Sequence, residues 1–224
     1  MTDAHCHVTG GDPSVREFLI GRDFIGVHPW EAMELSSEDV RRKTEDLKSR
    51  LASSVSSPAE PILGIGEIGL DRLKSREISQ QMREVFEVQL KLALEFNRPV
   101  VLHGAKCWGQ VVKTIQTIQT FQTSQTLLFH GFSRSDGLIP DIVALNGFIS
   151  VGPAVLNDHA VNYRELVKKI PLDRLLVETD RTPENAAECP SVREVAAAVA
   201  ELRGVSVAEL EKLTDENAER FRRR

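Results

Sequence analysis

Cysteine is scarce in this sequence, and its few copies are not arranged in pairs. The 224 residues include three cysteines, Cys6, Cys107 and Cys189. An odd number of cysteines without a CxxC spacing excludes the disulfide framework that staples many small secreted domains. We therefore expect free thiols in a reducing compartment. Cys6 is expected to be a small packed side chain rather than a metal ligand.

Long hydrophobic runs are also missing. No stretch approaches the roughly 18 apolar residues that a membrane span requires. The opening residues MTDAHCH carry no basic and apolar leader. These absences predict a cytoplasmic protein with no membrane segment, and nothing in the sequence indicates an obligate protein partner.

An excess of positive charge is the third absence. The chain has 28 lysines and arginines against 33 aspartates and glutamates, which gives a formal net charge of -5. A field of this sign repels a polyanion. Any contact with nucleic acid must therefore be local, or mediated by bound cations.

The residues that are present fit one globular unit. Hydrophobic residues make up 41% of the chain and charged residues 27%, which is typical of a globule with enough apolar side chains to fill a core. One α/β barrel commonly uses a chain of this length. We expect a single domain over residues 1–224.

Short apolar runs alternate with amphipathic segments from end to end, a pattern typical of repeated β/α units around a parallel sheet. The expected fold is therefore α/β, a TIM-type (β/α) barrel. The expected strands cover residues 2–7, 23–28, 61–68, 99–103, 126–131, 147–152 and 174–180.

The expected helices lie between and after these strands. They cover residues 36–54 and 75–97, and capping-box patterns announce two more, Ser191 with Glu194 and Ser206 with Glu209. The period-three tract at residues 114–126 is interpreted as an expanded surface helix and loop. The final RFRRR is interpreted as a solvated charge run.

The stretch DAHCH places three chemically active side chains on alternate positions of the first strand. Strand side chains alternate between faces, so Asp3, His5 and His7 share one face. Imidazole nitrogens suit zinc, manganese or iron, and a carboxylate such as Asp3 can orient one of them. The HxH pattern alone is a weak signal, because a lone histidine is more often a hydrogen-bonded packing residue.

Four further strands carry metal-binding residue types at the same level. Glu67 lies in GIGEIGLD, His103 ends VVLH, His130 ends LLFH, and Asp180 ends LLVETD. Barrel enzymes build their sites at the C-terminal ends of the strands. The coincidence of five strands predicts a metal centre there.

Four histidines and two carboxylates are too many ligands for one tetrahedral ion. They suit two ions that share a bridging carboxylate. Such a pair can lower the pKa of a water and neutralise charge that develops on a phosphoryl or carbonyl oxygen. The pattern therefore predicts a binuclear hydrolytic centre.

Eight motifs in chain order resemble the TatD-related metal-dependent hydrolases, a branch of the amidohydrolase-like TIM barrels. They are DAHCH, GVHPW, GIGEIGLD, NRPVVLHGAK, LLFHGFS, FISVGPAV, LLVETDRTP and LTDENAERF, and they cover nearly the whole chain. Members of this family are magnesium- or manganese-stimulated deoxyribonucleases, several of them 3′ to 5′ exonucleases. The resemblance implies a divalent-metal-dependent enzyme that cleaves phosphodiester bonds of DNA or a related substrate.

The resemblance also implies a role for each motif residue. His5, His7 and Asp180 would hold one ion, His103 and His130 the other, and Glu67 would bridge the two. Asp180 would also orient or deprotonate the attacking water, so Asp180 and Glu67 are the expected catalytic residues. The ions would be magnesium, manganese or zinc.

The chain departs from the family pattern near its start. Only 15 residues separate His7 from Asp23, where the family fits a helix, a strand and a second helix. Most of the second β/α unit is therefore expected to be missing, which predicts a distorted barrel with seven strong strands. The stretch SVREFLI, residues 14–20, would supply a remnant strand or helix, or the barrel would be incomplete.

Other departures concern the residues expected to bind substrate. Ala105 replaces the family's arginine, and Lys106 is expected to take over its phosphate contact as a point charge. His28 is expected to be a pocket residue rather than a ligand. Trp30, which replaces a histidine, would stack on a base or pack at the rim. Arg181 would bind phosphate or form an ion pair.

Four further residues leave two interpretations open. Trp108 would stack on a base or pack, and Arg72, Lys74 and Arg134 would contact phosphate or be ordinary exposed residues. His159 has no strand context and is expected at the surface.

Two other functions remain open. The same binuclear barrel supports hydrolysis of C–N or ester bonds in amidohydrolases and lactonases. Glu67 stands where many amidohydrolases have a carbamylated lysine, which favours the nuclease. The other alternative is a non-catalytic metal-binding protein, although the presence of all six ligands speaks against it.

Overall fold

The computed structural model describes residues 1–56, 62–118 and 125–223. The strands in these ranges are β1 (Thr2–Cys6), β2 (Arg16–Leu19), β3 (Phe24–Ile25), β4 (Gly64–Asp71), β5 (Val100–Ala105), β6 (Leu127–Phe129), β7 (Gly147–Val151) and β8 (Leu175–Val177). Each expected strand has a counterpart, and the first and last residues of the observed strands differ from the expected ones by three positions or fewer. Pro61, in the expected strand over residues 61–68, lies outside the described residues.

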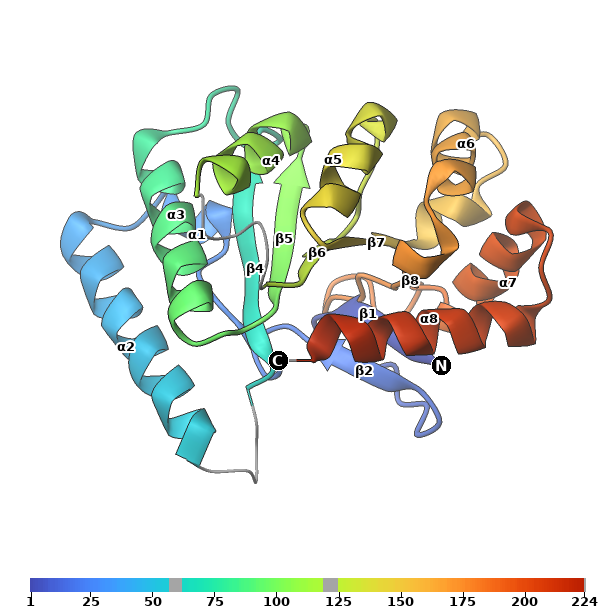
Figure 1. The fold of residues 1–224 in the computed structure, drawn as a ribbon, viewed down its shortest axis with the longest axis horizontal. Coiled ribbons are helices and arrows are strands. Elements are labelled where there is room, and N and C mark those ends of the chain that lie inside the picture. The colour runs from blue at the N-terminus through green and yellow to red at the C-terminus, as the bar shows by residue number, and fades with distance from the viewer. Residues whose placement is uncertain (57–61, 119–124, 224) are drawn as a thin grey trace.

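Helices alternate with these strands. They are α1 (Pro29–Ala32), α2 (Ser37–Ser56), α3 (Gln80–Glu95), α4 (Trp108–Thr117), α5 (Ile139–Ala144), α6 (Val161–Lys169), α7 (Val192–Arg203) and α8 (Val207–Arg222). Figure 1 shows α3, α4, α5, α6 and α7 following one another around the strands, while α8 runs along β1 and β2. The expected α/β class with a parallel sheet is confirmed.

The strands follow one another in chain order but belong to two hydrogen-bonded sheets. β1 pairs with β2, and β3 to β8 form a six-stranded parallel sheet. Short links join the two sheets at both ends. The Asp180 N–H donates to the His5 carbonyl over 3.0 Å, and Ile20 forms a parallel bridge with Phe24. The result is barrel-like, although the strand ladders do not close it.

The shortened second unit keeps its strand and lacks its helices. The stretch SVREFLI contributes β2, which pairs with β1 from Thr2 opposite Arg16. Of the alternatives expected for this stretch, the remnant strand is the one that forms, beside the seven strands that the sequence made clear. Residues 7–15 and 20–23 contain no helix, and 7–15 is shorter than the dozen or so residues that a parallel crossover normally takes.

Side-chain caps set the helix boundaries as expected. Ser191 accepts from the Glu194 N–H and Glu194 bonds back to Ser191, a complete capping box. Ser206 likewise accepts from the N–H of Glu209. The helix expected over 75–97 starts only at Gln80, because Ser79 caps it by accepting from the N–H of the third helical residue.

Two sequence features fall partly outside the described residues. The period-three tract continues α4 to Thr117, and its residues 119–124 are not described. At the C-terminus Arg222 pairs with Glu219 over 2.9 Å, which agrees with a solvated charge run, and residue 224 is not described.

Phenylalanines fill the inside of the barrel at the level where the strands begin. Phe18, Phe24, Phe148 and Phe221 are almost fully buried and share one core cluster. The Phe221 ring, from the last turn of α8, lies with its centroid 5.7 Å from that of Phe24 and 6.1 Å from that of Phe148. The C-terminal helix therefore seals this end of the barrel.

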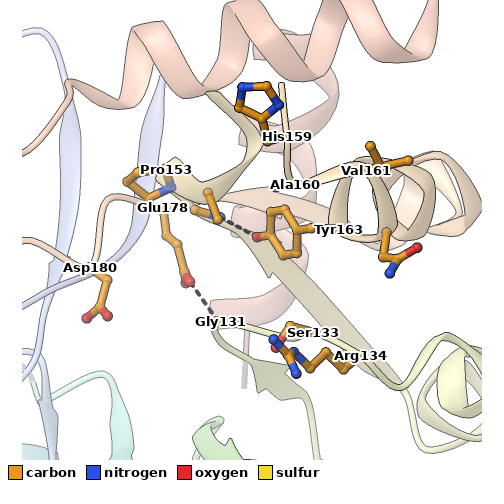
Figure 2. A pocket seen from close by; sticks show the side chains of 13 residues that line it. Gly131, Ser133, Arg134, Pro153, His159, Ala160, Val161, Tyr163, Glu178 and Asp180 are labelled. Carbon is orange, nitrogen blue, oxygen red and sulfur yellow. Dashed lines mark hydrogen bonds between the residues drawn. The ribbon is translucent and has the colours of Figure 1, made fainter. Parts of the chain in front are cut away.

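The opposite end is open. The C-terminal ends of β6, β7 and β8 and the start of α6 line a pocket of about 660 Å³ (Figure 2). Close strand packing supports this end, since a Cβ on Gly69 of β4 would lie 2.0 Å from the His103 carbonyl oxygen.

Within the described ranges, no helix is both long and apolar enough to cross a membrane.

Replacing Phe221 by alanine tests the sealing role of α8. The substitution removes a fully buried ring from the barrel interior, so we expect the free energy of unfolding to fall by about 3 to 5 kcal/mol. Leu73→Ala is the control because Leu73 is 57% exposed. Denaturant unfolding measures both, and equal stabilities would contradict the packing described.

Candidate metal centre

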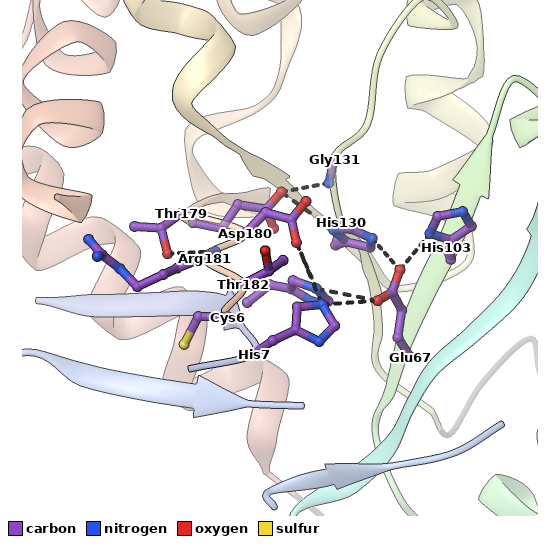
Figure 3. Close-up of polar contacts among 12 residues, drawn as sticks. Cys6, His7, Glu67, His103, His130, Gly131, Thr179, Asp180, Arg181 and Thr182 are labelled. Atoms are coloured by element: carbon purple, nitrogen blue, oxygen red, sulfur yellow. Dashed lines mark hydrogen bonds and ion pairs between the residues drawn. The ribbon is translucent and has the colours of Figure 1, made fainter. Parts of the chain in front are cut away.

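The six residues expected to bind metal converge at the open end of the barrel. They are His5 in β1, His7 just after β1, Glu67 in β4, His103 in β5, His130 just after β6 and Asp180 beyond β8. Figure 3 shows Glu67 between His103 and His130 on one side and His7 on the other. Six positions spread over 176 residues of chain therefore meet around one carboxylate.

One side of the cluster has the spacing of ligands around a common ion. His5 Nε2 lies 3.5 Å from both Glu67 Oε2 and Asp180 Oδ1. His7 Nε2 lies 3.6 and 3.7 Å from the same two oxygens. Ligand atoms that bind one ion at about 2.1 Å are separated by about 3 to 3.5 Å. The distances fit shared coordination better than direct hydrogen bonding.

The other side of the cluster is hydrogen-bonded to the remaining oxygen of Glu67. Oε1 lies 2.5 Å from His103 Nδ1 and 2.6 Å from His130 Nε2. The His130 ring also stacks on His5, with centroids 3.8 Å apart. Each oxygen of Glu67 therefore faces a different pair of histidines, which is the arrangement that a bridging carboxylate requires.

The donor atoms fit a divalent metal ion. Both ring nitrogens of His5 and the Nδ1 of His130 are buried without a hydrogen bond to any described residue. Buried polar atoms are normally satisfied, and imidazole with carboxylate is a donor set for zinc or manganese. Three groups among the described residues could hold an ion: His5, His130 and Asp180; His5, His7 and Glu67; and His28, Glu67 and His103.

Mutual charge stabilisation governs the pKa values in the cluster. Burial disfavours the charged form of Glu67, but His130 and His103 outweigh it and hold the pKa of Glu67 well below its usual range. Burial likewise opposes charge on His5, yet Asp180 and Glu67 raise the pKa of His5 to about 9. Without an ion, protons on the histidines therefore balance the buried carboxylate.

Two carboxylates that the sequence reasoning did not single out lie behind the second pair of histidines. Asp71 Oδ2 lies 2.7 Å from His103 Nε2, and Glu178 Oε1 lies 3.6 Å from His130 Nδ1. Asp71 therefore fixes the tautomer of His103 and leaves its Nδ1 free to bind a metal, whereas the Glu178 carboxylate favours the charged form of His130. The sequence could have indicated them, because Asp71 ends the motif GEIGLD and Glu178 begins the motif ETD.

Asp3 has a different role from the expected one. Its carboxylate accepts hydrogen bonds from the Thr179 N–H over 3.0 Å and from the Thr179 hydroxyl over 2.6 Å. Among the described residues its carboxylate bonds to no imidazole, although it accepts from the His5 backbone N–H over 3.3 Å, so the expectation that Asp3 orients a metal-binding ring is wrong. It ties β1 to the segment after β8. Burial raises the pKa of Asp3 to about 6, although the bonds from Thr179 oppose the rise.

Backbone geometry helps to place the sixth ligand. Asp180 has φ +50, a region that non-glycine residues adopt infrequently. Its N–H is held by the His5 carbonyl, and its own carbonyl accepts from Asn185. Its side chain remains 50% exposed, so a water molecule can reach the carboxylate.

His28 and Trp30 line the same site from the side of β3. His28 Nδ1 accepts from the Trp30 N–H over 3.2 Å, so the neutral ring carries its proton on Nε2. That Nε2 lies 3.6 Å from Glu67 Oε1. A ring that presents an N–H fits a pocket residue better than a ligand. Trp30 is 37% exposed, with the Lys74 Nζ 4.1 Å from its ring centroid.

The remaining expected substrate contacts differ in burial and in their partners. Lys106 is exposed directly after β5. The Arg181 guanidinium donates to the carbonyls of Ala186 and Cys189, so it holds the loop after β8. Trp108 is buried and packs on Phe129, which settles it as a packing residue.

Known proteins match most of this chain. Residues 21–223 match the family described as TatD related DNase, a range that begins after β1 and β2. The "Uncharacterized metal-dependent hydrolase YabD" of Bacillus subtilis (strain 168) is 32% identical over 204 residues, covering 88% of this chain and 75% of YabD. The "3'-5' ssDNA/RNA exonuclease TatD" of Pantoea vagans is 28% identical over 207 residues, covering 86% and 74% of the two chains.

Solved structures share the fold. The TatD homologue YjjV of Escherichia coli has a TM-score of 0.73 at 23% identity, covering 96% of this chain and 95% of YjjV. A TatD family hydrolase of Entamoeba histolytica has a TM-score of 0.71 at 15% identity, covering 92% of this chain and 75% of that chain. The barrel-like reading of the strands agrees with both.

Asp71→Asn tests the carboxylate behind His103. Loss of the charge weakens the preference for the tautomer that leaves His103 Nδ1 free, so the affinity for Mn²⁺ should fall by about 10- to 100-fold. Calorimetric titration of metal-stripped protein measures the affinity. Asp136→Asn, which removes only a surface pair with Lys169, is the control. Equal affinity in wild type and Asp71→Asn would sink the assignment.

Metal binding should also release protons. The pKa of His5 is raised to about 9, so its ring carries a proton at pH 7.5 without an ion, and Glu67 raises the pKa of His130 in the same direction. An ion displaces such a proton, and affinity therefore rises as pH rises toward 9. Titrations with Mn²⁺ in buffers of different ionisation enthalpy count the protons released. A heat independent of the buffer would contradict the pKa shifts.

Proposed function

The chain belongs to the TatD-related DNase family and is a metal-dependent hydrolase, and we propose that it cleaves phosphodiester bonds of DNA as a 3′ to 5′ exonuclease. The observation that carries the proposal is the buried Glu67 carboxylate, whose two oxygens face two separate pairs of histidines. The relative named as an exonuclease of single-stranded DNA and RNA supports this substrate class.

We assign the ligands of two divalent ions, magnesium, manganese or zinc, to the six clustered residues. His5, His7 and Asp180 would hold one ion, His103 and His130 the other, and Glu67 would bridge them, in line with their distances. Ions held there would lower the pKa of a water and neutralise charge on the phosphoryl oxygens. They would also offset the net negative charge of the chain, which repels DNA.

Asp180 would take the proton from the attacking water. Burial opposes its ionisation, but His5 lowers the pKa of Asp180 below its ordinary value, so the carboxylate is an ionised acceptor at neutral pH. Half of the side chain stays exposed, which leaves room for the water. A general base needs this combination of reach and protonation state.

Four residues would contact the substrate. His28 presents its Nε2–H beside Glu67 and would donate to a phosphoryl oxygen. Trp30, exposed beside Lys74, would stack on a base. Lys106 would contact a backbone phosphate in place of the arginine replaced by Ala105. For Arg181 the proposed phosphate contact rests on its position beside Asp180 alone, because carbonyls already hold its guanidinium.

We also propose that residues 1–224 act as one domain in the cytoplasm. The free thiols of Cys6, Cys107 and Cys189 support a reducing compartment. Burial raises the pKa of the Cys6 and Cys107 thiols, so these two side chains are inert packing groups.

Glu67→Ala tests the proposal directly. Without the bridge, hydrolysis of single-stranded DNA should fall by at least about 100-fold, and fewer ions should remain bound per chain. Metal analysis, activity and circular dichroism are measured on the same preparation. Glu45→Ala, at an exposed position of α2, should behave as wild type. A folded Glu67→Ala protein with near wild-type activity would remove the two-ion proposal.

Lys106→Ala tests the substitute phosphate contact. Loss of one exposed charge should raise KM for single-stranded DNA about three- to fivefold and leave kcat unchanged. Lys113→Ala, exposed on the following helix α4, is the matched control. If KM is the same in all three proteins, Lys106 is an ordinary surface residue.

A further inference from the structure

A pocket continues the metal cluster on the side of β6, β7 and β8. Asp180 and Glu178 line it at the cluster, and its far wall is the start of α6 (Figure 2). Its volume of about 660 Å³ lies within the 300 to 1,000 Å³ usual for small-molecule sites. A scissile phosphate held at the cluster would leave most of this space to another part of the substrate.

The pocket walls have the chemistry of a site for a flat organic group. Pro153, Ala154, Ala160, Val161 and Tyr163 contribute apolar surface. The Tyr163 hydroxyl accepts from the Gly152 N–H over 3.0 Å, which fixes the ring in the wall. Rigid apolar and aromatic walls with few polar groups are typical of nucleobase sites.

Two basic side chains complete the lining. Arg134 and His159 both reach the pocket, Arg134 from the segment after β6 and His159 from the turn before α6 (Figure 2). Arg134 is exposed, and its side chain lines the pocket. The expectation that His159 is an ordinary surface residue is therefore incomplete, because its exposed ring lines this pocket.

We propose that this pocket holds the 3′-terminal nucleotide that the reaction releases. The base lies between the apolar walls, and the Arg134 guanidinium lies beside an anionic or hydroxyl group of the same nucleotide. The inference rests on the proposed exonuclease function and adds the polarity of the bound strand. Trp30 in α1 and Lys74 in the segment after β4 lie together on the other flank of the cluster. The remaining strand would therefore leave the site over Trp30.

The reaction balances with water as the only co-substrate. The water oxygen bonds to phosphorus, and the bond from phosphorus to the 3′ oxygen of the preceding nucleotide breaks. Asp180 takes one water proton, and the departing 3′ oxygen gains one. The nucleotide in the pocket keeps the phosphate on its 5′ oxygen and leaves as a 5′-monophosphate.

Ala154→Trp fills the pocket from an exposed position of its wall. The probes are deoxyadenosine 5′-monophosphate and inorganic phosphate, titrated calorimetrically into the manganese-loaded full chain. Wild type should bind the nucleotide at least about tenfold tighter than phosphate, since one stacked base supplies that much affinity. In Ala154→Trp the advantage should disappear. Arg134→Ala should reduce it by severalfold.

Ala208→Trp, an exposed alanine on α8 outside the pocket, is the matched control and should retain the full advantage. A wild-type protein that binds both probes equally, or an Ala154→Trp protein that keeps the tenfold advantage, would overturn the pocket assignment. The proposed exonuclease function is tested by a separate measurement, the release of nucleotides from DNA by the wild type. Absence of release would contradict that function, whatever the two titrations show.

Discussion

The site depends on one buried carboxylate. Glu67 is only 4% exposed, and its two oxygens face His5 and His7 on one side and His103 and His130 on the other. A charge in that position is costly unless it is paired, so the four imidazoles and the carboxylate require one another. Ions and protons compete for the same nitrogens, which couples metal binding to pH.

The barrel is what makes this convergence possible. Parallel strands end on one face, so residues far apart in sequence reach the same centre. The phenylalanine layer around Phe221 fills the opposite end, and Asp3 fastens β1 to the segment that carries Asp180. The shortened second unit removes helices near β2, whereas Glu67 lies on β4, His103 on β5 and His130 just after β6. The loss therefore spares the centre.

The sequence predicted the parts of this structure that follow from strand periodicity and strand ends. Glu67, His103 and His130 were found because each lies at or near the end of an apolar run, and their convergence follows from the fold class. Asp71 and Glu178 were missed because a second acidic residue at a strand end looks like a solvated terminus until the imidazole beside it is placed. The partners of Asp3 and Arg181 depend on loop packing, which periodicity does not encode.

The four-residue β2 shows the same limit. With Arg16 exposed and Glu17 half-buried, this stretch has too few alternating positions for the sequence to decide between a remnant strand and a helix, and the strand forms because β1 offers a free parallel edge. The boundaries of α3 also shifted, since Ser79 caps the helix in competition with the earlier serine at Ser75. Elements with long periodic patterns were predictable, and those decided by one tertiary contact were not.

The most direct measurement is release of nucleotides from 3′-labelled single-stranded DNA by metal-stripped protein, repeated with magnesium, manganese and zinc and with Asp180→Asn beside the wild type. Release that requires an added ion and is lost in Asp180→Asn is the predicted result. Absence of release with every ion, or equal release by Asp180→Asn, would contradict a metal-dependent nuclease in which Asp180 accepts the proton of water. The first of these outcomes would direct the search to C–N or ester bonds as the substrate class of this centre.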